Sequence, residues 1–309
     1  MIQVTFLGTG AATPSVARGV AALAMQREGE VLLFDCGEGT QRQMMRYGTG
    51  FTLEDVFVTH YHADHILGIP GLLRTMGLMA RTRPIHLWGP KGAARTLGEL
   101  VTLGMERPKF PVEIHELQPG DVVARGDYEI QVGAAEHKGP CLAYALVEHE
   151  RLGRFDPERA RALGIPEGPL WGRIHRGEAV TAPDGRVVDP GELVGPARPG
   201  RRVVYSGDTA PCDSVMRLAA GADLLVHEAT FGDDERDRAI ETRHSTAREA
   251  AELARDAGVR QLVLTHISNR YSREAPELLL EAQVRFPATT IARDGLVIEV
   301  GFPDADPAA

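Results

Sequence analysis

The sequence has few cysteines and no long apolar run. Its three cysteines, Cys36, Cys141 and Cys212, lie far apart and none belongs to a CxxC pair. This spacing excludes a disulfide framework or a cysteine-based zinc knuckle and is typical of a reducing cytoplasm. No apolar run approaches the roughly 20 residues that a membrane helix requires. The first residues, MIQVTFLG, read as a strand without a leader region, so we predict neither a secretion signal nor membrane association.

The sequence also lacks the positive net charge that is usual for nucleic-acid-binding proteins, because its formal net charge is −9. The charge is unevenly distributed, however. Residues 151–202 contain ten arginines and seven acidic residues, a net charge of +3, so the remainder carries −12. A basic segment within an acidic chain indicates a local surface for an anionic partner.

Strand patterns alternate with helical patterns along most of the chain, which predicts an α/β layered fold. Helices are predicted over 38–48, closed by Gly48, over 69–83, begun by Pro70, and over 245–258. In the second of these, Leu72, Leu73, Met76 and Met79 share one face. We interpret that face as part of the core, and a subunit interface is the second interpretation.

Residues 150–197 differ from the rest in being dense in proline, glycine and arginine. The stretch TAPDGRVV predicts a small β-hairpin. We interpret this segment as a flexible arm inserted in a single domain that spans residues 1–309. A plain surface loop is the alternative, although an unstructured loop of about 50 residues is rare in a compact domain. Residues 302–309 are expected to form a frayed tail.

Five predicted strands deliver a polar side chain at their C-terminal ends. In α/β folds ligands bind at this edge of the sheet, so the polar residues at these five strand ends predict one shared site. The strands are VFVTH, YEIQVGAAEH, RVVYSGD, LLVHE and LVLTH, which end at His60, His137, Asp208, His227–Glu228 and His266.

The stretch HYHADH has the pattern H-x-H-x-D-H. His60 and His62 point to the same side of an extended chain and can bind one ion, whereas Asp64 and His65 follow a turn and can face a second. Imidazole and carboxylate ligands without thiolate suit zinc, with manganese or iron as substitutes.

The remaining ligands must come from elsewhere in the chain. His137 is expected to complete the first ion's site, His266 the second, and Asp208 to bridge both ions. His227 is expected to be structural. The histidines without a comparable setting are interpreted as structural or surface residues; they are His86, His115, His149 and His175.

These motifs resemble the metallo-β-lactamase superfamily and, within it, the short form of the ribonuclease Z (tRNase Z) family over nearly the whole chain. FLGTGAATP, DCGEGTQRQ, HYHADH and YSGDT resemble its early and metal motifs. HEAT, RHST and THISNRYS resemble its late motifs, and LGIPEGPLWGRIHRG resembles the tip of its tRNA-binding arm.

The resemblance implies a four-layer αββα sandwich with two zinc ions and the same ligand assignment as above. It also implies a cytoplasmic homodimer whose substrate is precursor tRNA, not DNA. The early loop departs from the family pattern P-x-K-x-R-N at Val16 and Gly19, although Pro14 and Arg18 match it. The cleavage position and the discrimination against a CCA end are therefore left open.

The implied reaction is phosphodiester hydrolysis that removes the 3′ trailer. We expect Asp64 to hold an ion and accept a proton from water, His244 to protonate the leaving 3′ oxygen, and Glu228 to orient His244. An alternative is a hydrolase of small substrates, such as an arylsulfatase or lactonase, which has no use for an arm. A non-catalytic RNA-binding protein is a further alternative, but it predicts missing ligands.

Overall fold

The computed structural model describes residues 1–104, 107–271 and 274–302, so Ser272 of the late motif and residues 303–309 of the expected tail lie outside the described residues. The chain divides into two compact units. The larger comprises Met1–Val147 and Arg202–Gly301, and the smaller comprises Glu148–Arg201 and Phe302–Ala309. No helix within the described ranges is long and apolar enough to cross a lipid bilayer.

The first β-sheet of the larger unit is antiparallel on one side and parallel on the other. Strand β1 pairs antiparallel with β16 and β2, and the strands from β3 to β6 run parallel. In β3, Leu32 and Phe34 face one core and Val31 and Leu33 face another, as the two-residue period of a strand requires. The described strands are, in spatial order, β16 (Val297–Val300), β1 (Ile2–Gly8), β2 (Ala22–Arg27), β3 (Glu30–Phe34), β4 (Asp55–Phe57), β5 (Ile85–Gly89) and β6 (Val112–Glu116).

The second β-sheet has a parallel half that is buried on both faces. Strands β12 to β15 run parallel, whereas β12 and β9 are antiparallel. All five residues of β13 are buried, which explains its nearly continuous apolar sequence. The described strands are, in spatial order, β15 (Thr289–Ile291), β14 (Leu262–Thr265), β13 (Leu224–Glu228), β12 (Arg202–Tyr205), β9 (Leu142–Glu148), β8 (Tyr128–Ala134) and β7 (Val122–Ala124).

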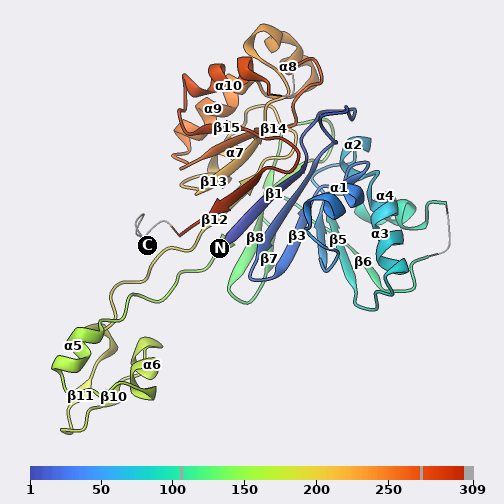
Figure 1. The fold of residues 1–309 in the computed structure, drawn as a ribbon. Coiled ribbons are helices and arrows are strands. Elements are labelled where there is room, and N and C mark those ends of the chain that lie inside the picture. Colours follow the sequence, from blue (N-terminus) through green and yellow to red (C-terminus); the bar gives the residue numbers. More distant parts are fainter. Residues whose placement is uncertain (105–106, 272–273, 303–309) are drawn as a thin grey trace. The chain divides into compact units, whose positions relative to one another are not determined.

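The larger unit has four layers, because each sheet packs on the other and on its own helices (Figure 1). Between the sheets, Phe57 stacks on Phe34 at 5.3 Å and contacts the ring of Tyr144 at 5.4 Å. This confirms the predicted αββα architecture. The helices beside the first sheet are α1 (Thr40–Tyr47), α2 (Ala63–Ile66), α3 (Ile69–Leu78) and α4 (Ala93–Thr102); those near the second are α7 (Asp213–Leu218), α8 (Arg236–Thr242), α9 (Ala247–Asp256) and α10 (Pro276–Gln283), with the 3-10 turn η2 (Asp233–Glu235).

The helix signals of the sequence are largely confirmed. Helix α1 ends at Gly48 in the left-handed conformation, and α9 begins with a capping box between Thr246 and Glu249. Helix α3 ends at Leu78, well before the predicted end at residue 83. The prediction that Met79 faces the core is therefore wrong: it lies past the last turn and is 62% exposed.

The smaller unit has its own secondary structure and a small core. Val180 pairs with Val188 in the predicted hairpin. Ile165, Ile174 and Leu193 are buried against one another with other apolar side chains of this unit. Its described elements are α5 (Pro157–Ala162), α6 (Pro169–His175), β10 (Val180–Thr181), β11 (Val187–Val188) and η1 (Pro190–Glu192).

The net charge of this segment depends on its bounds: residues 151–202 carry +3, whereas Glu148–Arg201 of the smaller unit carries zero. With the bounds Glu148–Arg201, the segment contains nine arginines and nine acidic residues, because Glu148 and Glu150 now count and Arg202 belongs to the larger unit. Several arginines pair with these acidic residues; the pairs are Arg161–Glu167, Arg173–Glu178, Arg186–Glu192 and Arg201–Glu148.

Candidate metal centre

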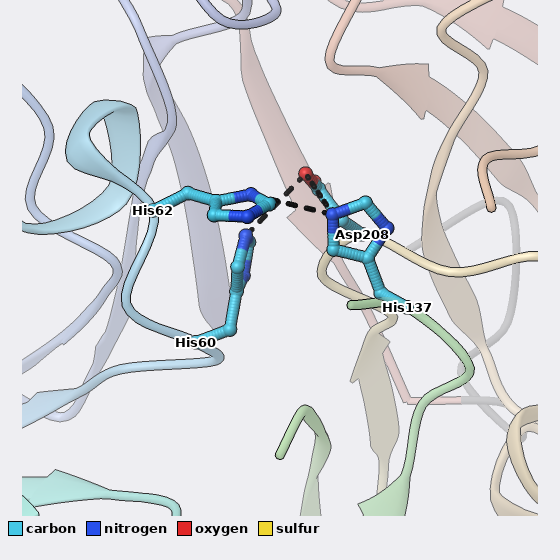
Figure 2. A group of neighbouring side chains, drawn as sticks. All are labelled: His60, His62, His137 and Asp208. Carbon is cyan, nitrogen blue, oxygen red and sulfur yellow. Dashed lines mark hydrogen bonds and ion pairs between the residues drawn. The ribbon is translucent and has the colours of Figure 1, made fainter. Parts of the chain in front are cut away.

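Three loops of the larger unit bring the first group of metal-type ligands together. His60 and His62 follow β4, His137 follows β8, and Asp208 follows β12. One donor atom from each of these four side chains lies within 4.8 Å of the others (Figure 2). His62 Nδ1 lies 3.3 Å from His137 Nε2, and His60 Nε2 lies 3.6 Å from Asp208 Oδ2.

A second group of ligands adjoins the first and shares Asp208 with it. Asp64, His65 and His266 place their donor atoms within 4.8 Å of one another. Asp208 Oδ2 lies 3.4 Å from both His65 Nε2 and His266 Nε2. All seven predicted ligands therefore lie in two adjoining groups, with Asp208 between them. His227 is in neither group; it is buried, and its Nδ1 contacts the carbonyl oxygen of Glu228 at 2.7 Å.

The ligand atoms fit a metal ion because several have no other partner. His60 Nε2, His65 Nε2 and Asp208 Oδ1 are buried and make no hydrogen bond among the described residues. Burying a polar atom without a partner costs free energy. The three unpaired atoms therefore indicate that a ligand binds between them. Imidazole and carboxylate donors without thiolate suit zinc and related ions.

Burial and neighbouring charges set the protonation of these ligands. Burial, and then the nearby His65, lower the pKa of His60 well below its usual value, which favours the neutral form that binds metal. Burial alone would raise the pKa of Asp208, but His266 and His65 beside it hold that pKa well below its usual range. Both residues are thus in their ligating forms near neutral pH.

In four of the five ligand histidines, the ring nitrogen that faces away from the cluster also has a partner. Such second contacts fix the orientation of the ring and its tautomer. His60 Nδ1 lies 3.0 Å from Thr59 Oγ1 and His65 Nδ1 lies 2.8 Å from Asp35 Oδ2. The other two contacts are His137 Nδ1 with the Arg243 carbonyl oxygen and His266 Nδ1 with Thr230 Oγ1, each at 2.8 Å.

Asp35 is the supporting residue that sequence reasoning missed. Its buried carboxylate accepts hydrogen bonds from the Thr59 amide at 2.8 Å and the Tyr205 hydroxyl at 2.9 Å, and it contacts His65. Asp35 adopts the left-handed conformation with φ 54°, which is uncommon outside glycine and typical of functional sites. The available signal was its position directly after the apolar strand VLLF, the same setting as the other strand-end ligands.

The backbone conformation beside Asp208 requires a glycine at position 207, within the motif YSGDT. Its φ is 59°, and a Cβ atom there would meet the side chain of Thr59 at 2.8 Å. A larger residue would therefore displace either Thr59, which contacts His60, or the Asp208 loop. His266 also adopts the left-handed region, with φ 55°, directly after β14.

His244 and Glu228 form a partly buried ion pair beside the two ligand groups. His244 Nδ1 lies 2.6 Å from Glu228 Oε1, and its ring stacks on His266 at 5.4 Å. Glu228 is held in turn by the amides of Thr209 and Thr230. Burial opposes protonation of His244, but the Glu228 carboxylate outweighs it and raises the pKa of His244 to about 9. His244 is therefore a cation at neutral pH.

The early loop lies against the second ligand group. The amide of Ala12 donates a hydrogen bond to Asp64 Oδ2 at 2.8 Å. Arg18 is buried and bonds to Thr9 Oγ1 and the carbonyl oxygen of Ala292, whereas Val16 is fully exposed. A cavity of about 480 Å³ lies between this loop and α1, and its lining includes Arg42, Arg46, Tyr47 and Asp294.

Comparison with known proteins agrees with this geometry. The family model of the anti-Pycsar protein Apyc1 matches residues 2–145, and the β-lactamase superfamily domain matches residues 187–267. The chain is 60% identical over 305 residues to ribonuclease Z of Gemmatimonas aurantiaca, covering 98% of this chain and 97% of that protein. It is 53% identical over 305 residues to ribonuclease Z of Myxococcus xanthus, covering 98% and 99%.

A solved structure supports the same conclusion. The short form of human tRNase Z superposes with a TM-score of 0.71 and 29% identity, covering 97% of this chain and all of that one. The two sheets and the seven-ligand cluster are consistent with the match to the β-lactamase superfamily domain. The chain therefore belongs to the ribonuclease Z family.

Proposed function

We propose that this protein is a metal-dependent endoribonuclease of the cytoplasm that removes the 3′ trailer from precursor tRNA. Hydrolysis would leave a 3′ hydroxyl on the tRNA and a 5′ phosphate on the trailer. The observation that carries the proposal is the arrangement of seven ligands in two groups that meet at Asp208, next to the His244–Glu228 ion pair. Membership of the ribonuclease Z family supports it.

The ligand groups divide between two ions, for which zinc is the first choice and Mn²⁺ or Fe²⁺ are substitutes. When bound, such ions polarise a phosphoryl oxygen and lower the pKa of water towards neutrality. One would be held by His60, His62 and His137, the other by Asp64, His65 and His266, with Asp208 contacting both. This division follows the two groups in which the donor atoms lie.

His244 is suited to protonate the leaving 3′ oxygen. General acids work best when they are protonated at the working pH and hold their proton only moderately tightly. A pKa of about 9 meets that requirement at pH 7, and Glu228 both raises the pKa and fixes the ring. Glu228 therefore acts as a positioning residue for His244.

Asp64 is better suited to ligation than to accepting a proton. Burial would raise its pKa, but the hydrogen bond to His266 and the nearby His65 hold the pKa below its usual range. Its Oδ2 also accepts a hydrogen bond from the Ala12 amide. Since a weakly basic, already hydrogen-bonded carboxylate is a poor general base, we assign Asp64 to metal binding alone.

The smaller unit would bind the tRNA body. The net charge of zero over Glu148–Arg201 is no obstacle, because three of its arginine pairs lie at the surface. In the first of them, the Arg161 and Glu167 side chains are 57% and 62% accessible. Exposed ion pairs contribute little stability, so a phosphate can replace the carboxylate partner and be bound through two N–H groups. Arg159 is exposed and has no side-chain ion pair within the described part of the chain, so it is available to phosphate directly.

A homodimer is part of this proposal. Leu78 and Met79, at the end of α3, are large apolar side chains exposed by 90% and 62%. Clustered exposed apolar residues are typical of interaction surfaces. Sedimentation equilibrium of the wild type and of a variant with Leu78→Glu tests this: we expect a dimer for the first and a monomer for the second.

The direct test uses a precursor tRNA with a 3′ trailer. We expect one discrete cut, located by sequencing the 3′ ends of products from CCA-containing and CCA-lacking precursors. Hydrolysis of a small phosphodiester without any cut in the precursor would instead favour a small-substrate hydrolase. Binding of the precursor without hydrolysis would favour a non-catalytic RNA-binding protein.

A further inference from the structure

A second cluster of potential metal ligands lies on strands β5 and β6, apart from the seven-residue centre. His86, Glu113 and His115 each offer one donor atom, and these three atoms lie within 4.8 Å of one another. His86 pairs in register with Glu113, and Trp88 with His115. Paired residues on neighbouring strands share a face of the sheet, so all four side chains project from the same face.

The distances between the donor atoms match those of a coordination site. His86 Nδ1 lies 3.1 Å from His115 Nε2, and Glu113 Oε2 lies 3.4 Å from His86 Nδ1 and 3.9 Å from His115 Nε2. Tetrahedral zinc with bonds of about 2.0–2.1 Å separates its ligand atoms by about 3.4 Å. Within the seven-residue centre, neighbouring donor atoms lie at comparable separations, such as 3.3 Å and 3.6 Å.

The neighbouring side chains hold this cluster in place. The Trp88 ring stacks on His115 at 4.0 Å, and its indole N–H donates to Asp55 Oδ1 at 2.6 Å. Asp55 also pairs with Arg125 at 2.8 Å, so these two charges cancel. Among the described residues, the negative charge of Glu113 faces only the two imidazoles. This charge favours binding of a cation between the three side chains.

The cluster is also open to solvent. The side chains of His86, His115 and Glu113 are 26%, 33% and 51% accessible. An ion can therefore reach it, and water can complete the coordination that three protein ligands leave unfilled. The simpler interpretation is a hydrogen bond between the two imidazoles, which requires a proton on one of the two facing nitrogens. A bound cation would take the place of that proton.

We propose that His86, Glu113 and His115 form a separate binding site for a divalent transition-metal ion, with zinc as the first choice. The ion would link β6 to β5. In the described sheet β6 is the last strand and pairs with β5 alone, so it is the element that gains most from such a link. This role is independent of hydrolysis at the seven-residue centre.

The test compares zinc content and melting temperature in the full-length protein. Wild type, His86→Asn and Glu113→Gln are dialysed against excess zinc, and bound metal is counted by mass spectrometry. His86→Asn leaves the stack of Trp88 on His115 intact, and His149→Asn, at an exposed histidine outside the ligand groups of the described residues, is the matched control.

We expect wild type and His149→Asn to bind the same number of zinc ions, and His86→Asn to bind one fewer. This difference does not depend on how many ions the seven-residue centre holds. Added zinc should raise the melting temperature further in wild type and His149→Asn than in His86→Asn. Glu113→Gln should bind the additional ion more weakly. Precursor cleavage should be unchanged in all three variants. Equal zinc content and equal melting shifts in all four proteins would overturn the proposal and leave a hydrogen bond between the imidazoles.

Discussion

In the metal centre most of the ionisable side chains are buried and held by hydrogen bonds, whereas most of the arginine–carboxylate pairs of the smaller unit lie at the surface. Asp208 is almost fully buried and contacts ligands of both groups, while both partners of the Arg161–Glu167 pair are more than half accessible. When a buried charged group loses its partner, water cannot replace that partner. An exposed group that loses its partner is solvated by water at little cost in free energy. The centre should therefore be sensitive to single substitutions and the smaller unit only to the loss of many contacts.

Asp208→Ala should have the largest effect, because it removes the one carboxylate shared by both ligand groups. Loss of a residue that only supports a ligand typically costs about 10–100-fold in activity or affinity, so loss of this ligand should cost more. Cleavage of precursor tRNA and of bis-p-nitrophenyl phosphate should both fall, together with bound metal. The control is Asp213→Asn, an exposed acidic residue in the first turn of α7. A full nuclease rate in Asp208→Ala would contradict the assignment.

Deletion of residues 155–194 should come next and should affect only the large substrate. The Gly195 amide already donates to the Arg154 carbonyl oxygen at 2.9 Å, so a two-glycine link can join these residues without disturbing the larger unit. We expect hydrolysis of bis-p-nitrophenyl phosphate to persist and precursor cleavage to be lost. Retained precursor cleavage would show that the smaller unit does not bind the substrate.

Glu228→Gln should shift the pH dependence of cleavage. His244 has a pKa of about 9 because the Glu228 carboxylate outweighs burial. Without that charge, burial is opposed less strongly and the pKa of His244 falls, so its acid form is lost as the pH rises through a lower value. The alkaline limb of the pH–rate profile should move to lower pH, with little loss in acidic buffer. His244→Asn should lack this limb, and an unchanged profile in Glu228→Gln would argue against the role of the pair.

Asp35→Asn should weaken one metal site while leaving the fold intact. The amide keeps the size of the carboxylate but removes the charge that faces His65 Nδ1 at 2.8 Å. We expect metal affinity to fall by about 10–100-fold and activity to recover when zinc is added in excess. Competition with a chelator measures the affinity. Equal affinities in variant and wild type would indicate that Asp35 serves only packing.

Arg161→Ala should have the smallest effect. Because its ion pair with Glu167 is exposed, the free energy of unfolding should change by less than about 1 kcal/mol. The salt dependence of precursor binding should weaken by no more than about one phosphate contact. Arg255→Ala, which breaks the exposed pair with Asp256 in the larger unit, is the control and should leave the salt dependence unchanged. A large loss of cleavage from Arg161→Ala alone would contradict the view that contacts are spread over this unit.

Local signals in the sequence predicted much of the fold. Gly48 and the Thr246–Glu249 capping box mark helix ends that the structure confirms. The end of α3 was predicted too late, because the apolar period continues to Met79 although the helix has already ended there. The net charge of the inserted segment depends on its bounds: residues 151–202 carry +3, whereas Glu148–Arg201 carries zero because it includes Glu148 and Glu150 and leaves out Arg202.

The sequence by itself determined which residue types lie at the strand ends where the seven ligands meet, because strand ends and the H-x-H-x-D-H spacing are local properties of the chain. Only the tertiary structure decided which distant side chains support them. Asp35 contacts Thr59, His65 and Tyr205 across both sheets. His86 likewise meets Glu113 and His115 through the register of β5 with β6. Such contacts join residues far apart in the chain, and no local period encodes the packing and register that bring them together.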